Sequence, residues 1–259
     1  MIYDCHVHLP SPRSGVTLEW QPHTPDVPSA IRYLRRCGID HILASTALGL
    51  EAKTHQDMIA GNDEIASIAS EYPDFVVPTC QVNTNFHQEA LIEVRRCHDK
   101  LNMIWVGELC AYAGEYSYRT PAFADMVHLA TRLNMIVNFH EDDYREVERI
   151  CQAFPDTTLV LAHLADTPED TVNRIGLAQR YPNLYLDICG WGIERMGVLE
   201  HAVRMAGPDR VLFGSDFTIN DPASVIARVE KSYLDEETKE KILGGNLVRL
   251  LKEHGWTGR

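Results

Sequence analysis

The chain has 259 residues, of which 45% are hydrophobic and 24% charged, a composition typical of a folded globular protein and not of a disordered or fibrous one. Its net charge is −13, with 37 acidic residues against 24 lysines and arginines. Because no basic stripe interrupts this acidity and no apolar run is long enough to span a bilayer, we expect neither nucleic acid nor a membrane as a partner. Seven cysteines without a CxxC pair favour reduced thiols and a cytoplasmic protein.

Short apolar, β-branched runs alternate along the chain with segments of helical periodicity, which is typical of a parallel sheet and its crossover helices. The predicted strands are Ile2–His8, Ile39–Thr46, Phe75–Val82, Met103–Leu109, Met135–His140, Thr158–His163, Asn183–Cys189 and Arg210–Asp216. The predicted helices are Ser29–Cys37, Asn62–Glu71, Glu89–His98, Ala122–Leu133, Tyr144–Phe154, Pro168–Tyr181, Glu194–Met205, Asp221–Tyr233 and Glu236–His254. Eight β/α units without a flexible linker predict a single (β/α)8 TIM barrel domain over residues 1–259.

Polar residues of one chemical kind end several of the predicted strands. His6 and His8 are two residues apart on the first strand, so both side chains face the same side, and neutral imidazoles suit a transition metal. Four later strands also end in a metal-competent residue: Glu108, His140, His163 and Asp216. Because the carboxyl ends of barrel strands converge, the sequence predicts one pocket with a site for one or two divalent ions.

Each of these residues also has an ordinary structural interpretation. Glu108 alone is compatible with a solvated loop carboxylate, His140 or His163 with a hydrogen-bonded core histidine, and Asp216 with a helix cap. A coincidence would have to recur at the same end of five strands, so the set as a whole favours a metal site.

Candidate substrate-binding residues follow the strands in the predicted loops. Tyr112 and Arg119 follow the fourth strand, Trp191 follows the seventh, and Arg13 lies in the loop after the first. An arginine at the barrel mouth would bind a substrate carboxylate through two hydrogen bonds. Each of these residues is equally compatible with a solvated surface position.

The strand-end residues, the Arg210–Phe217 run and the Lys241–Leu251 tail together resemble the amidohydrolase superfamily, and more narrowly its amidohydrolase 2 branch of lactonases and decarboxylases. The resemblance implies that His6, His8 and Asp216 bind a first metal. Gly107-Glu108 departs from the single-metal members and is similar to TatD-like hydrolases, in which this glutamate bridges two metals.

The resemblance leaves two arrangements open. In the two-metal arrangement, Glu108, His140 and His163 bind the second ion. In the single-metal arrangement, His140 completes the first site and His163 transfers a proton or stabilises an oxyanion.

These residues predict a metal-dependent hydrolase that cleaves an ester, lactone or amide of a small metabolite with metal-activated water. Zinc is the first expectation for the ion, and manganese or another divalent ion is the alternative. Asp216 would act as general base and His163 as a second catalytic residue. Non-oxidative decarboxylation at a single metal and a non-catalytic metal-binding barrel remain as alternatives, and the sequence is compatible with a homo-oligomer.

Overall fold

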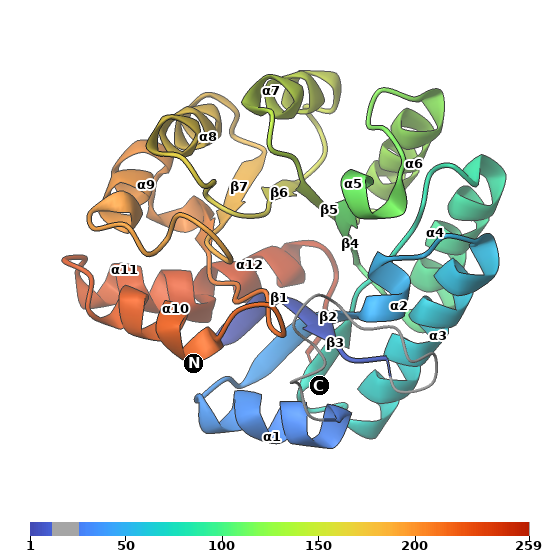
Figure 1. Ribbon diagram of the computed structural model, residues 1–259, viewed down its shortest axis with the longest axis horizontal. Coiled ribbons are helices and arrows are strands. Elements are labelled where there is room, and N and C mark those ends of the chain that lie inside the picture. The colour runs from blue at the N-terminus through green and yellow to red at the C-terminus, as the bar shows by residue number, and fades with distance from the viewer. Residues whose placement is uncertain (12–25, 259) are drawn as a thin grey trace.

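The computed structural model describes residues 1–11 and 26–258. Within them the strands are β1 (Tyr3–Leu9), β2 (His41–Thr46), β3 (Val76–Pro78), β4 (Trp105–Cys110), β5 (Ile136–His140), β6 (Leu159–Leu161), β7 (Leu184–Asp187) and β8 (Val211–Leu212). Every ladder between neighbouring strands is parallel. The strands lie at the centre of the molecule and the longer helices surround them (Figure 1).

The eight strands close into a cylinder at two seams. Hydrogen-bonded ladders form one sheet of β1-β2-β3 and another of β4 to β8. A bridge between Cys80 and Val106 joins β3 to β4, and a bridge between Val7 and Phe217 joins β8 back to β1. The backbone N–H of Cys5 also donates to the carbonyl of Phe213 at 3.0 Å. These contacts confirm the predicted (β/α)8 barrel.

The predicted crossover helices are present, with changes at their ends. The described helices are α1 (Val27–Arg36), α2 (Ala47–Leu50), α3 (His55–Glu71), α4 (His87–Leu101), α5 (Ala111–Gly114), α6 (Pro121–Arg132), α7 (Tyr144–Ala153), α8 (Pro168–Arg180), α9 (Val198–Ala206), η2 (Pro208–Arg210), α10 (Pro222–Glu230), α11 (Glu236–Glu240), η3 (Lys241–Gly245) and α12 (Asn246–Glu253). The helix expected from Glu194 begins only at Val198, because Gly197 precedes it with a left-handed φ of 82°.

Two further differences concern short segments. The expected helix Glu236–His254 is divided into α11, a π-helical turn η3, and α12. The short helices α2 and α5, which follow β2 and β4 directly, were not expected, because four residues are too few to show helical periodicity.

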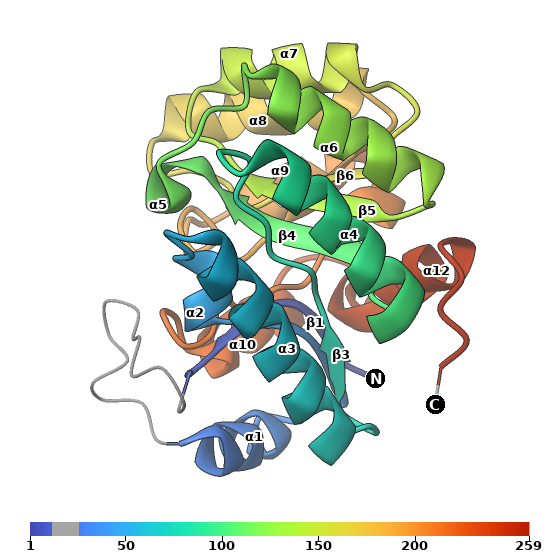
Figure 2. The same ribbon diagram turned by 90° about the vertical axis from the view of Figure 1, so that its right-hand side faces the viewer.

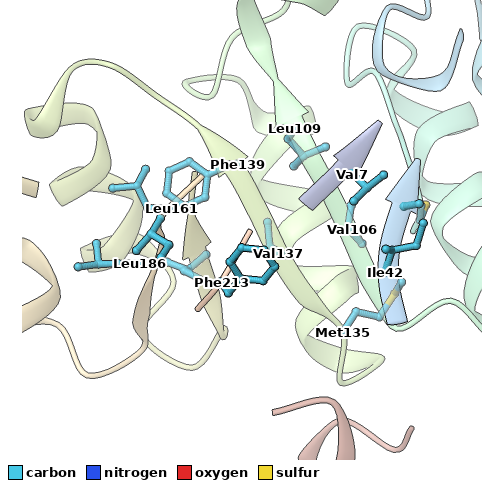
Figure 3. Packing of buried hydrophobic residues seen from close by; sticks show 14 of the residues in the cluster. Val7, Ile42, Val106, Leu109, Met135, Val137, Phe139, Leu161, Leu186 and Phe213 are labelled. Carbon is cyan, nitrogen blue, oxygen red and sulfur yellow. The ribbon is translucent and has the colours of Figure 1, made fainter. Parts of the chain in front are cut away.

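Buried hydrophobic residues form two main layers. The larger cluster includes Val137 and Phe139 of β5 and Phe213, which follows β8 (Figure 3). It also includes buried residues of the surrounding helices. The second cluster joins the early residues of six strands, among them Trp105, to Leu250 of α12 and its neighbours. Helix α12 therefore closes the amino-terminal end of the barrel, opposite α2 and α5 (Figure 2). The carboxyl end of the barrel is the end at which a catalytic site is expected, as is usual in this fold.

None of the helices in the described ranges combines the length and the apolar character that crossing a membrane requires.

We expect Leu250→Ala to lower the free energy of unfolding by about 2–5 kcal/mol, because Leu250 is 1% exposed and its removal leaves a cavity under the barrel. Urea unfolding followed by circular dichroism measures this loss. The exposed Lys252 of the same helix provides a control, and Lys252→Ala should change the stability by less than about 0.5 kcal/mol. Equal effects of the two substitutions would contradict the proposed packing of α12.

Candidate metal centre

The six predicted metal ligands meet at the carboxyl end of the barrel, with Glu108 between two pairs of histidines. Glu108 Oε2 lies 3.3 Å from Nε2 of His6 and 3.4 Å from Nε2 of His8. The other oxygen, Oε1, lies 3.4 Å from Nδ1 of His140 and 3.4 Å from Nε2 of His163. One carboxylate thus faces imidazoles from four different positions along the chain.

Three groups of donor atoms among the described residues are compact enough to hold an ion, and two of them consist of predicted ligands; the third is His6 with Asp187 and Cys189. In the first, Nε2 of His6 and Nε2 of His8 are 3.0 Å apart, and Asp216 Oδ1 lies 3.6 and 3.5 Å from them. The second group consists of Glu108, His140 and His163, whose ligand atoms lie within 4.8 Å of one another. Imidazole and carboxylate donors at these separations suit a transition metal bound at about 2.0–2.2 Å.

The two histidines of β1 are anchored through the nitrogens that face away from Glu108. His6 Nδ1 is hydrogen bonded to Asp187 Oδ2 at 2.7 Å, and His8 Nδ1 to Ser45 Oγ at 2.8 Å. A partner on Nδ1 fixes the tautomer in which the Nε2 lone pair faces the ligand group. Asp187 and Ser45 are buried, so this orientation is built into the barrel.

The buried acidic and imidazole side chains of this site shift one another's pKa values. Burial lowers the pKa of His6, but the electrostatic effect of the nearby Cys189 and Glu108 outweighs burial and raises it well above its usual value. Burial raises the pKa of Glu108, but the charge of His6 and the nearby imidazoles of His140 and His163 bring it well below its usual value.

One buried oxygen among the candidate ligands lacks a hydrogen-bond partner, and this also fits a metal ion. Glu108 Oε1 is a buried oxygen without a hydrogen-bond partner, and an uncompensated buried carboxylate oxygen is costly. A divalent cation between the histidines would satisfy this oxygen and replace the protons that the pocket otherwise attracts. The residues present therefore match the group that the sequence predicts.

Two of the ligands lie on strained backbone immediately after short strands. The predicted strands reach His163 and Asp216, whereas β6 ends at Leu161 and β8 at Leu212. The reason is conformational, because His163 has φ 64° and Asp216 φ 59°, left-handed values that non-glycine residues adopt at a cost. Gly190 completes this arrangement, since a Cβ there would collide with the His163 ring.

The four predicted substrate-binding residues divide into two groups. The Tyr112 ring lies 5.0 Å from that of His140, and the Trp191 ring 5.7 Å from that of His163. Tyr112 and Trp191 are 68% and 49% exposed, so their rings lie at the surface beside the buried histidines. Arg119, in contrast, pairs with Glu146 of α7 at 2.7 Å, so its charge is already compensated by a carboxylate of the helical layer. Arg13 lies outside the described residues.

Sequence reasoning missed the residues behind the ligands. Asp187 and Ser45 lie within predicted strands, and a carboxylate inside the apolar run Asn183–Cys189 was a usable signal. Cys189 is a further such residue, because its Sγ lies 3.1 Å from Nδ1 of His6 and its carbonyl oxygen 3.3 Å from Nδ1 of His163.

Residues 3–252 match the family model described as amidohydrolase. The chain belongs to the amidohydrolase family. Its fold is similar to 2,6-dihydroxybenzoate decarboxylase from Rhizobium, with a TM-score of 0.76, 16% identity and coverage of 98% of this chain and 99% of the other. It is also similar to 5-carboxyvanillate decarboxylase from Sphingomonas paucimobilis, with a TM-score of 0.76, 13% identity and coverage of 97% and 98%.

A third similar structure is a dihydroxybenzoic acid decarboxylase from Polaromonas sp. JS666 with bound manganese and the inhibitor 2-nitroresorcinol. Its TM-score is 0.72 at 16% identity, with coverage of 97% of this chain and 96% of the other. A comparison with curated proteins found no match. These results confirm the predicted family, the barrel, and an enzyme of a metal-dependent family.

The similar structures named above are decarboxylases. At 13% to 16% identity their likeness shows the shared barrel fold. One of them contains manganese, and zinc in this amidohydrolase stays a prediction.

We expect Asp187→Asn to weaken divalent-metal binding about 10–100-fold, because the variant loses the carboxylate that orients His6 and increases its basicity. Competition with a chromogenic chelator measures the dissociation constant. The surface carboxylate–histidine pair Asp125–His87, 2.9 Å apart, provides the matched control, and Asp125→Asn should leave the constant unchanged. Unchanged affinity in Asp187→Asn would contradict the orienting role.

Proposed function

We propose that this amidohydrolase catalyses the non-oxidative decarboxylation of a small hydroxylated aromatic acid, with a divalent cation bound by His6, His8 and Asp216. The observation that carries the proposal is the pair of partly exposed rings, Tyr112 and Trp191, beside the buried ligand set. Aromatic side chains at a pocket mouth suit a planar ring. The substrates in the names of the similar structures, dihydroxybenzoate and carboxyvanillate, have this chemistry.

The reaction needs a cation, a proton donor and a place for the ring. When bound, the cation supplies positive charge that holds and polarises the oxygens of the substrate. His140, with its Nδ1 near Glu108, would be a further ligand of this cation. The rings of Tyr112 and Trp191 orient the aromatic plane of the substrate. Helix α12 closes the amino-terminal end of the barrel, so the substrate binds at the carboxyl end, beside the candidate ligands.

Asp216 is placed to supply the proton. Its Oδ1 faces His6 and His8, while Asn220 Nδ2 donates to the other oxygen at 3.3 Å. A proton carried on this second oxygen passes to the ring carbon that bears the carboxylate. The bond between that carbon and the carboxylate then breaks, its electron pair restores the aromatic ring, and carbon dioxide leaves.

Glu108 favours a second candidate function. Its two oxygens face different histidine pairs, which is the arrangement expected of a ligand shared by two cations. A centre of that kind suits hydrolysis of an ester, lactone or amide of a small metabolite by activated water. The number of ions bound per chain separates the two functions.

The decisive experiment combines metal analysis with a substrate panel. We expect manganese-loaded protein to hold one ion per chain and to release carbon dioxide from 2,6-dihydroxybenzoate or 5-carboxyvanillate. His6→Ala/His8→Ala should lose both the ion and turnover, whereas the surface pair His87→Ala/His98→Ala should lose neither. Two ions with turnover of esters, lactones or amides alone would establish the hydrolase, and no turnover of either panel would favour a binding protein.

Trp191→Ala tests the aromatic mouth. We expect KM to rise about 3–10-fold with kcat nearly unchanged, because a stacking contact contributes about 0.5–1.5 kcal/mol. Steady-state kinetics of carbon dioxide release provides both constants. The control is Tyr233→Ala, a substitution at an 82% exposed tyrosine outside the ligand set. A fall in kcat at constant KM would contradict a binding role for Trp191.

A further inference from the structure

Arg174 is a fully buried charge behind the second group of metal ligands. It lies on α8 with 0% exposure and extends over the ends of β5 and β6. Its Nη1 donates to the carbonyls of Ala162 and His163, each at 3.0 Å. Its Nη2 donates to Asp142 Oδ1 at 3.1 Å and to the carbonyl of Glu141. A buried guanidinium is tolerated only with such a set of acceptors.

Asp142 in turn contacts His140, one of the candidate metal ligands. Asp142 Oδ1 lies 3.3 Å from Nε2 of His140, the nitrogen that faces away from Glu108. The opposite nitrogen, Nδ1, is the one 3.4 Å from Glu108 Oε1. Asp142 thus has the same relation to His140 as Asp187 has to His6, although its side chain is 85% exposed and needs Arg174 to hold it in place.

The contacts with the carbonyls restrain the neighbouring ligand. His163 has the strained φ of 64°, and the guanidinium binds its carbonyl together with that of Ala162. The rings of His140 and His163 lie 4.6 Å apart. The guanidinium of Arg174 therefore contacts both Asp142, the partner of His140, and the backbone of His163. Its planar set of N–H donors reaches acceptors that a single ammonium group cannot reach together.

We propose that Arg174 is a positioning residue that holds His140 and His163 toward Glu108, acting through Asp142 and through the backbone of Ala162 and His163. The inference rests on the proposed function only in requiring a divalent cation at this site. It applies to the decarboxylase and to the hydrolase, because both use these histidines. Asp142 is the exposed residue in the contact series from Arg174 to His140. Substitutions of this side chain leave the hydrophobic core intact.

The test uses Co²⁺ as a spectroscopic probe in the full-length protein. We expect Asp142→Ala to weaken Co²⁺ binding about tenfold or more and to shift the visible absorption bands, because His140 loses its outward partner. Asp142→Asn, which keeps an acceptor oxygen but no charge, should fall between Asp142→Ala and wild type. The control is Asp156→Asn at an exposed carboxylate, which should match wild type, and all three variants should keep the wild-type melting temperature.

Arg174→Lys extends the test to the guanidinium group itself. This variant keeps the charge but loses the fork, so it should perturb the Co²⁺ spectrum more than Asp142→Ala does, because both histidines lose support. If Arg174→Lys fails to fold, the Asp142 variants still decide. The inference is overturned if wild type binds Co²⁺ and Asp142→Ala gives the same spectrum and affinity. A wild-type chain that binds Co²⁺ but releases no carbon dioxide would overturn the decarboxylase alone, and one that binds no divalent ion would overturn both proposals.

Discussion

The structure depends on one buried carboxylate, that of Glu108. The residue is 5% exposed, and its two oxygens lie within 3.4 Å of imidazole nitrogens from four histidines. A carboxylate in such a position is stable only if positive charge or hydrogen bonds compensate it. The ends of β1, β5 and β6 bring their histidines to this charge, and a cation is the partner that we propose for it.

An imidazole can serve this arrangement only if its other nitrogen is held. The barrel provides a different outward partner for each ring: Asp187, Ser45, Asp142 and the carbonyl of Cys189. Asp187 and Cys189 come from the end of β7, Ser45 from β2, and Asp142 from the segment after β5. Much of the buried polarity at this end of the barrel thus serves to orient ligands, which also explains why strained backbone is tolerated at His163 and Asp216.

The two ends of the barrel have different physical roles. At the amino-terminal end, α12 packs Leu250 and its neighbours against the strands, and this contact contributes stability. At the carboxyl end lie the candidate ligand groups, with the exposed side chains of Tyr112 and Trp191 beside them. Separation of the two roles allows the ligand end to carry strain without loss of the fold.

The sequence by itself determined the eight β/α units and the six strand-end ligand candidates, because hydrophobic periodicity is local and parallel strands must bring their carboxyl ends together. Only the tertiary structure decided which residues contact the outward nitrogens of the histidines among them. His6 and Asp187 are 181 positions apart, and Arg174 reaches acceptors on two other elements. The pairing of Arg119 with Glu146 was equally invisible, because a long side chain takes the nearest opposite charge, and that charge is brought near only when α7 packs on the barrel.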